Sequence, residues 1–231
     1  MHRRGWLFDV YPAHATMVVW LYQEDGTLLR LEDPFRPRLY ARGPPEDLRA
    51  LARATLKARV CSRCELTTRQ EFWSGAAVKA LALEVADYSM FPRLLRRLPE
   101  FEARITFYNC DIPLAQYYLY CREIFPFGQC EVEHDGCTIT HIRSRDTPED
   151  RHYPIPALRT LELQLTEDPL ISLYRGNTLL VTLDGQSYEF TTNDPAELLR
   201  QLNAFLTRYD PDLILTDYGD TAIFPALLRL A

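Results

Sequence analysis

The feature that most constrains the fold is the order of hydrophobic patterns between residues 38 and 108. Residues 38–41, 65–73, 77–86 and 104–108 predict strands, from their apolar content and the turn residues between them. A first helix begins at Pro44-Pro45, with proline in its first turn, and continues with apolar residues at positions 48, 51, 52 and 56. Residues 91–98 predict a second, short helix. The order is therefore strand, helix, strand, strand, helix, strand.

This order is that of a split βαβ, or ferredoxin-like, sheet, which RNA-recognition modules share. In those modules aromatic residues on the central strands stack on bases. Residues 77–86 offer Val78, Leu81, Leu83 and Val85 instead. The sequence therefore favours a scaffolding role for this sheet over base stacking.

Two further hairpins are predicted outside this region. Strands at residues 5–10, 16–24 and 27–32 include a turn at Asp25-Gly26, and their apolar content indicates that they pack against a larger body. A second hairpin is predicted to turn at Asp135-Gly136. It would pair His134 with Cys137, Val132 with Ile139 and Cys130 with His141 on one face.

The cysteines and histidines predict no single zinc site. Cys61 and Cys64 form a lone C-x-x-C pair, which needs two further ligands. The hairpin offers two Cys/His pairs, but four residues of strand separate them by ~13 Å, too far for one tetrahedral ion. We therefore interpret these residues as one half-buried face of the hairpin.

The rest of the chain predicts a second α/β unit after a linker. A helix is expected from residue 111 to 121, with Asp111 as its cap and Pro113 in its first turn. Residues 146–156 collect prolines and charges and predict the linker. Strands then follow at 157–165, 170–174, 179–183 and 188–191. After these come a helix at 195–208 capped by Asn193 or Asp194, an apolar and buried strand at 213–216, and a helix beginning near Ala222.

Composition and charge limit the class of protein. The 231 residues are 47% hydrophobic and 25% charged, as in globular proteins. The net charge of −6 gives no bulk attraction to a polyanion, so any nucleic-acid contact requires a local basic patch. No stretch approaches the ~20 apolar residues that span a bilayer, and the first residues lack an apolar signal core. We expect a cytoplasmic protein with no membrane contact.

Two segments resemble family B DNA polymerases of the archaeal and bacterial type. The segment YNCDIPLAQYYL (residues 108–119) is similar to the strand and Asp-Ile-Pro helix that precede the exonuclease domain in that family. About a hundred residues downstream, the segment YDPDLILTDYGDTAIFPALL (residues 209–228) resembles the second exonuclease motif. Together the two segments are fairly specific.

The resemblance implies an α+β fold in two domains. Residues 1–150 would be the polymerase N-terminal domain, β-rich with a ferredoxin-like part. Residues 151–231 would be the first half of an RNase H-like 3'–5' exonuclease domain, truncated, with an exposed apolar edge where further elements would pack. The parent protein would be a DNA-directed DNA polymerase of replication or repair, with Mg²⁺ as its cofactor.

The same resemblance implies that proofreading chemistry is lost. Family B exonucleases hold two metal ions between carboxylates, an Asp-x-Glu pair on the first strand and an aspartate after the turn of the second motif. The matching positions here are Gln164, Thr166 and Ile223, which cannot supply that charge. A rescue by displaced carboxylates would use Glu162, Asp217 and Asp220. As strand and turn residues, these three are also explained without catalysis.

Three functions remain open at this point. The first is a non-catalytic module, without a cofactor of its own, that supports the remaining polymerase domains and guides template or single-stranded DNA. Its candidate phosphate contacts are Arg93, Arg96 and Arg97, which otherwise form a solvated helix face. Archaeal relatives sense template uracil with this domain, but no residue here is matched to that pocket. The second is a metal-dependent exonuclease with displaced carboxylates. The third is a protein-interaction module derived from a polymerase.

Overall fold

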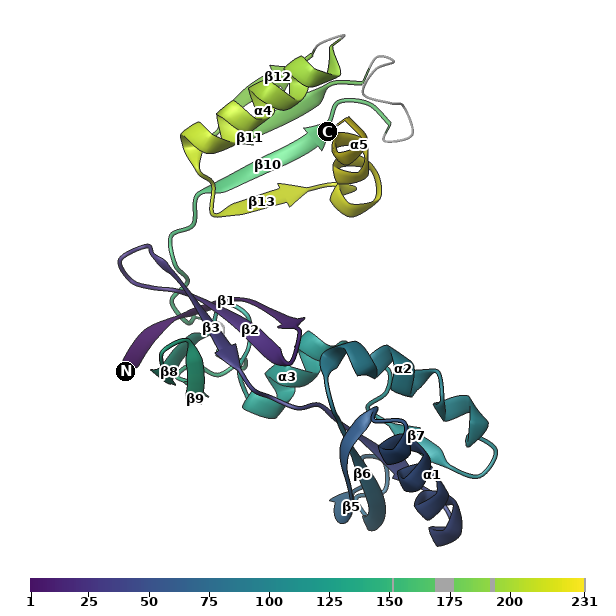
Figure 1. Ribbon diagram of the computed structural model, residues 1–231. Helices are drawn as coiled ribbons and strands as arrows, with labels where there is room; N and C mark the ends of the chain where they lie inside the picture. Colours follow the sequence, from purple (N-terminus) through teal and green to yellow (C-terminus); the bar gives the residue numbers. More distant parts are fainter. Residues whose placement is uncertain (151, 169–176, 192–193, 231) are drawn as a thin grey trace. The chain divides into compact units, whose positions relative to one another are not determined.

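The computed structural model describes residues 1–150, 152–168, 177–191 and 194–230 (Figure 1). The fold is α+β and dominated by sheets, as predicted. The chain divides into two compact units, Met1–Pro156 and Ala157–Ala231. Among the described residues, no helix combines the length and apolar character needed to cross a bilayer.

The first unit contains a closed barrel of five strands in the order β1-β2-β3-β9-β8. These strands are β1 (His2–Ala13), β2 (Thr16–Tyr22), β3 (Leu28–Asp33), β8 (Gln129–Asp135) and β9 (Thr138–Ser144). Helix α3 (Leu114–Arg122) contributes the fully buried Tyr118 to the barrel core. The Tyr118 hydroxyl donates to Asp33 Oδ2 at 2.9 Å, and Arg122 donates to Asp33 Oδ1 at 2.8 Å. The predicted strands thus pack within this barrel, and α3 contributes to the barrel core.

The predicted register of the second hairpin is wrong. Its loop is Gly136-Cys137 rather than Asp135-Gly136, because Asp135 pairs with Thr138. A bulge after Glu133 then shifts the pairing, so that Glu133 faces His141. Cys137 and His141 are exposed while Cys130 and His134 are buried, so the two predicted Cys/His pairs do not form.

The second sheet of the first unit has the order β5-β6-β4-β7, all antiparallel. Its elements in chain order are β4 (Arg38–Arg42), α1 (Pro45–Lys57), β5 (Cys61–Gln70), β6 (Ala77–Val85), α2 (Phe91–Leu95) and β7 (Thr106–Tyr108). The predicted element order is confirmed. The first hairpin strand begins at Cys61 and ends at Gln70, and α2 ends at Leu95, before a 3₁₀ turn at Leu98–Glu100.

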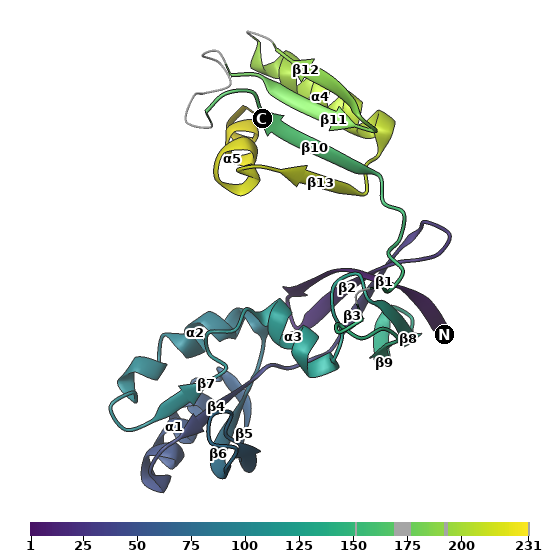
Figure 2. The ribbon, with the colours of Figure 1, turned by 180° about the vertical axis from the view of Figure 1, so that it is seen from behind.

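One face of this sheet is covered by α1 and α2, and the opposite, more open face has α3 beside it only near Arg38 and Tyr40 among the described residues. Side chains alternate along each strand, so Leu39, Leu81 and Leu83 point into a core with residues of α1 and α2. The alternate residues of these strands point to the opposite face, away from α1 and α2. Figure 2 shows the same elements from behind.

The predicted cap of α3 is not formed. The helix begins at Leu114, its N-cap residue is Pro113, and no side chain caps it. Asp111 lies three residues before the helix begins, which is too early for its carboxylate to accept from the first free amides.

The second unit is a mixed sheet with one helical layer. Its strands are β10 (Thr160–Leu165), β11 (Leu179–Leu183), β12 (Gln186–Phe190) and β13 (Leu213–Thr216), in the order β12-β11-β10-β13, with β13 parallel to β10. Helix α4 (Pro195–Tyr209), a π-helical turn (Gly219–Ile223) and α5 (Phe224–Leu230) pack on the sheet (Figure 1). Asp194 caps α4, accepting from the Ala196 amide at 3.0 Å. The strand predicted at 170–174 lies outside the described residues.

The prediction that residues 213–216 form a buried strand is wrong. Leu213, Ile214 and Thr216 are half-buried and Leu215 is 47% exposed. The reason is position in the sheet, since β13 pairs only with β10 among the described strands and so lies at an edge.

Candidate nucleic-acid interface and exonuclease positions

Two of the three predicted exonuclease positions lie on the face of the second unit's sheet that points away from its core. Leu161 and Leu163 of β10 point into the core, so Glu162, Gln164 and Thr166 point the other way. The Gln164 amide lies 3.5 Å from Asp217 Oδ2, at the end of β13. The Thr166 hydroxyl accepts from the Thr178 amide at 3.2 Å. At the two positions predicted to match the Asp-x-Glu pair, a neutral amide thus lies beside a carboxylate and a neutral hydroxyl accepts from a backbone amide.

The third position is part of the hydrophobic core. Ile223 is 0% exposed and belongs to the same apolar cluster as Leu161 and Leu227. It ends the π-helical turn that follows Tyr218, whose φ is 59°. A side chain at this place contacts apolar groups, and a metal ion there would find no water and no anionic ligand.

The rescue carboxylates are exposed and do not form a ligand cluster. Glu162 lies between Thr182 of β11 and Leu215 of β13, and Asp217 and Asp220 stand in the segment after β13. Within the described parts of the chain, no group of three His, Cys, Asp or Glu side chains could hold a metal ion. As they lie in the structure, Glu162, Asp217 and Asp220 therefore do not provide the converging carboxylates that a pair of metal ions requires.

The two aspartates of the Asp-Pro-Asp motif have a structural role that the sequence did not reveal. The Arg159 amide donates to Asp212 Oδ2 at 2.9 Å, and the Arg159 guanidinium contacts Asp210 and Asp212, each at 3.2 Å. Hydrogen bonding to Arg159 lowers the pKa of Asp212. Asp210 ends α4 in the left-handed conformation. The motif thus joins the end of α4 to the start of β10.

The predicted arginine cluster lines a shallow cavity of about 360 Å³. Arg93, Arg96 and Arg97 surround it together with Ala58, Val60 and Glu100. Arg96 Nε donates to the Pro92 carbonyl at 3.3 Å. In the described parts of the chain none of the three arginines forms an ion pair. Their charges are therefore available to an anion.

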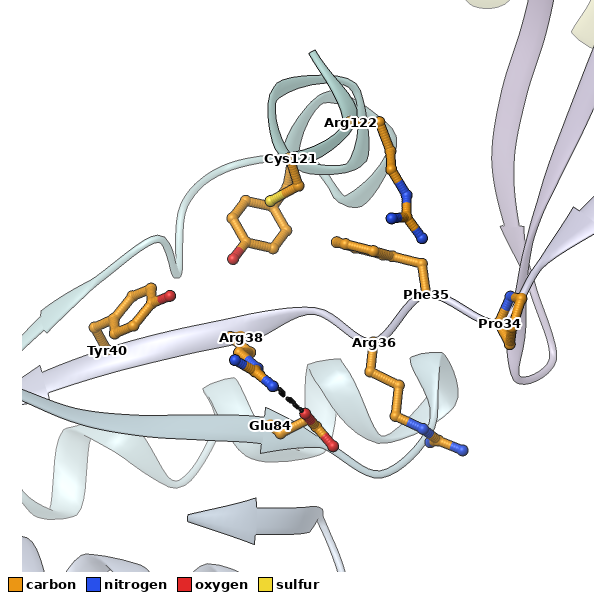
Figure 3. A pocket seen from close by; sticks show the side chains of 9 residues that line it. Pro34, Phe35, Arg36, Arg38, Tyr40, Glu84, Cys121 and Arg122 are labelled. Carbon is orange, nitrogen blue, oxygen red and sulfur yellow. Dashed lines mark hydrogen bonds and ion pairs between the residues drawn. The ribbon is translucent and has the colours of Figure 1, made fainter. Parts of the chain in front are cut away.

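A second cationic pocket, of about 470 Å³, was not predicted (Figure 3). It lies between the segment that joins β3 to β4 and helix α3. Its charged lining consists of Arg36, Arg38, Arg122 and Glu84, and its aromatic lining includes Phe35, Tyr40 and Tyr117. Arg38 and Arg122 have carboxylate partners, so the positive charge available in the pocket comes from Arg36.

The pocket's arginines are fixed by different partners. Arg38 donates to Glu84 at 2.9 Å, and Arg122 is held by Asp33 at 2.7 Å and lies over the Phe35 ring at 5.5 Å. Partial burial opposes ionisation of Glu84, but hydrogen bonds from Arg38 and Ser62 outweigh it and lower the pKa of that carboxyl. Arg36 donates to the Ala86 carbonyl and has no carboxylate partner among the described residues. The only sequence feature that could have indicated this pocket is the segment PFRPR at residues 34–38, and it forms a pocket only because α3 packs opposite it.

Comparison with known proteins identifies the fold. Neither a protein-family model nor a curated protein sequence matches this chain. Among solved structures, it is similar to the family B DNA polymerase from the hyperthermophilic archaeon Pyrobaculum calidifontis, with a TM-score of 0.75 and 20% sequence identity. The likeness covers 99% of this chain and 32% of the polymerase chain. The chain therefore has the fold of about one third of a family B DNA polymerase.

Proposed function

We propose that this chain is the N-terminal portion of a family B DNA polymerase or of a polymerase-like protein. The observation that carries the proposal is the likeness to such a polymerase over 99% of the chain. In this proposal residues 1–150 are the N-terminal domain, containing the barrel and the split βαβ sheet. Residues 151–231 are the first half of an RNase H-like exonuclease domain. Its partners are DNA and the remaining polymerase domains, and Mg²⁺ serves the parent polymerase.

The proposal includes a 3'–5' exonuclease site that is inactive. It is supported by the amide at Gln164, the hydroxyl at Thr166 and the buried alkyl group at Ile223. None of these three groups can bring anionic charge to a metal pair. The chain then acts as a scaffold and as a guide for template or single-stranded DNA, through its two arginine-lined cavities.

The guide role is tested by a salt titration of binding to a fluorescent oligothymidylate. Arg96→Ala/Arg97→Ala should weaken binding and reduce the slope of log K against log salt by up to about 1.4, at about 0.7 per lost phosphate contact. Arg49→Ala/Arg53→Ala, two exposed arginines of α1, removes the same net charge and is the matched control. Negligible binding that does not vary with salt would contradict the guide role and favour the protein-interaction module.

An active exonuclease with displaced carboxylates is the second candidate. It is favoured by the position of Asp217 beside Gln164, on the face that also carries Glu162. The test is digestion of a 5'-labelled single strand with Mg²⁺ or Mn²⁺, comparing the wild type with Glu162→Gln, Asp217→Asn and Asp220→Asn. Absence of metal-dependent cleavage by the wild type rules out this candidate. Cleavage that any of the three substitutions abolishes would establish it.

A further inference from the structure

The open face of the β5-β6-β4-β7 sheet carries a pocket separate from the predicted exonuclease positions and from the cluster of Arg93, Arg96 and Arg97. Strand alternation places Tyr40 and Arg42 of β4, Arg69 of β5 and Tyr108 of β7 on this face, opposite the core. Between them, β6 presents only Val78, Ala80 and Ala82 before Glu84. Small residues flanked by large ones leave a hollow of about 270 Å³ above Ala80.

Aromatic side chains surround this hollow. Tyr40 and Tyr108 are directly paired across β4 and β7. Phe72 and Trp73, in the turn between β5 and β6, complete the lining and pack edge to face, with ring centroids 5.1 Å apart. The sequence had predicted no base stacking here because β6 lacks aromatic residues. The structure brings them from β4, β7 and the hairpin turn instead.

The exposure of the two turn aromatics is unusual. Phe72 is 87% and Trp73 is 90% exposed, although each could bury a large apolar area. Contiguous exposed apolar groups in a folded protein commonly mark a binding surface. Neither side chain contributes to any of the three core clusters, so folding alone does not explain them.

Positive charge accompanies the aromatic rings. The Arg69 guanidinium lies over the Tyr40 ring, 5.2 Å from its centroid, and donates to the Tyr40 hydroxyl at 3.2 Å. Arg69 has no carboxylate partner in the described parts of the chain. Arg42 is paired with Glu71 at 3.2 Å. Because Glu71 neutralises Arg42, the charge of Arg69 leaves the pocket positive, and it lies next to the aromatic rings.

We propose that this pocket, defined by Tyr40, Arg69, Phe72, Trp73 and Tyr108, binds unpaired bases of single-stranded DNA. Aromatic faces accept any base by stacking, and neighbouring arginines contact the phosphates, which is the composition of single-strand binding surfaces. A lone apolar peptide partner would not require the unpaired Arg69 charge. The class of ligand rests on the proposed function. The lining residues differ from those of both arginine-lined cavities, except that Tyr40 also lines the cavity of Arg36, Arg38 and Arg122.

The test combines binding with tryptophan fluorescence. A fluorescein-labelled oligothymidylate and an abasic deoxyribose-phosphate strand of equal length are titrated into the full chain. Wild type should bind the oligothymidylate more tightly than the abasic strand, and only the former should quench Trp73. Trp73→Ala should weaken oligothymidylate binding by about 5- to 150-fold, the range measured for loss of one stacked base, and Trp73→Phe should restore most of it.

Two controls separate the site from general effects. Tyr120→Ala removes a 61% exposed aromatic residue of α3 and should leave binding unchanged. Arg69→Ala should weaken binding to both strands, because a phosphate contact does not need a base. Thermal unfolding of Trp73→Ala should match the wild type, since the side chain is outside the cores.

Three outcomes overturn the inference. Salt-dependent binding that Arg96→Ala/Arg97→Ala weakens but Trp73→Ala does not would overturn this site and leave the guide role standing. Equal affinity for the oligothymidylate and the abasic strand, without quenching, would do the same. No binding of either strand would overturn both the site and the guide role, and would assign the exposed aromatics to a protein partner.

Discussion

Ile223 provides the sharpest test of the finding that the third predicted exonuclease position belongs to the hydrophobic core. Its side chain is 0% exposed in the apolar cluster formed by the sheet, α4 and α5. Truncating such a side chain costs about 2–4 kcal/mol, and burying an unpaired neutral polar group adds about 1–3 kcal/mol. Ile223→Asn should therefore destabilise the second unit by about 3–7 kcal/mol at any pH.

Ile223→Asp adds a dependence on pH whose sign is fixed by burial. Burial disfavours the carboxylate, so the folded-state pKa of an aspartate here is raised above its unfolded value of about 3.9. Its protonated form persists in the folded state, and folding loses about 1.4 kcal/mol per pH unit as the pH rises from about 4 toward the folded pKa. The deficit of Ile223→Asp relative to Ile223→Asn should thus grow by up to about 2.7 kcal/mol between pH 5 and pH 7.

A unit of this size has only ~4–11 kcal/mol to lose, so Ile223→Asp should be largely unfolded at pH 7 and partly recovered at pH 5. The assay is hydrogen exchange by mass spectrometry on peptides of α4 and β11, because all three tryptophans lie in the first unit. Wild-type protection in Ile223→Asp at pH 7 would refute the reasoning, since the carboxylate would then reach solvent beside Gln164. Equal destabilisation by Asp and Asn at both pH values would refute the burial argument alone.

Three further predictions concern the first unit. The Glu131 carboxylate is held by Arg143, Arg145 and Arg4, and these contacts, led by the Arg143 hydrogen bond, lower its pKa to about 2. Its contribution to stability is therefore present above about pH 4.5 and lost as the pH falls toward 2. The difference in Tm between wild type and Glu131→Gln should shrink over that interval, and a constant difference would contradict it. Tyr118→Phe removes the 2.9 Å hydrogen bond to buried Asp33 and should lower the free energy of unfolding by about 1.5–3 kcal/mol in urea titrations; an unchanged midpoint would show that Arg122 alone satisfies Asp33. Gly5→Ala would place a Cβ 2.6 Å from the Tyr22 carbonyl oxygen and should lower the free energy of unfolding by about 1–3 kcal/mol, measured by thermal unfolding. An unchanged Tm would mean that β1 and β2 can move apart at this point without cost.

Local patterns predicted the elements better than their register. The strand-helix-strand-strand-helix-strand order and the Asp194 cap follow from residues near one another in sequence, and both are confirmed. The register of the β8–β9 hairpin was mispredicted because its loop is Gly136-Cys137, one residue later than Asp135-Gly136, and a bulge between Glu133 and His134 then shifts the remaining pairs. A bulge leaves no distinctive signal in a strand pattern. The burial of β13 failed because an apolar strand has the same composition at an edge as in the centre.

The candidate sites depended more heavily on the tertiary structure. The sequence alone identified Arg93, Arg96 and Arg97 as a candidate cluster, because they are close neighbours in the chain, in α2 and the two residues after it. It could not identify the pocket of Arg36, Arg38 and Arg122, whose arginines come together only when α3 packs against the barrel. Nor could it identify the aromatic pocket, since Tyr40, Trp73 and Tyr108 are brought to one sheet face by strand order.

By itself, the sequence determined the nature of most segments and the resemblance of two motifs to family B polymerases, and from that resemblance it predicted that Gln164, Thr166 and Ile223 stand where carboxylates would be expected. These are properties of residue types and spacings along the chain. The tertiary structure decided which side chains face one another. It buried Ile223 in the core, bound Asp210 and Asp212 to Arg159, and left Phe72 and Trp73 exposed beside Arg69. The physical reason is that burial and charge pairing depend on contacts between residues distant in sequence, which periodicity does not encode.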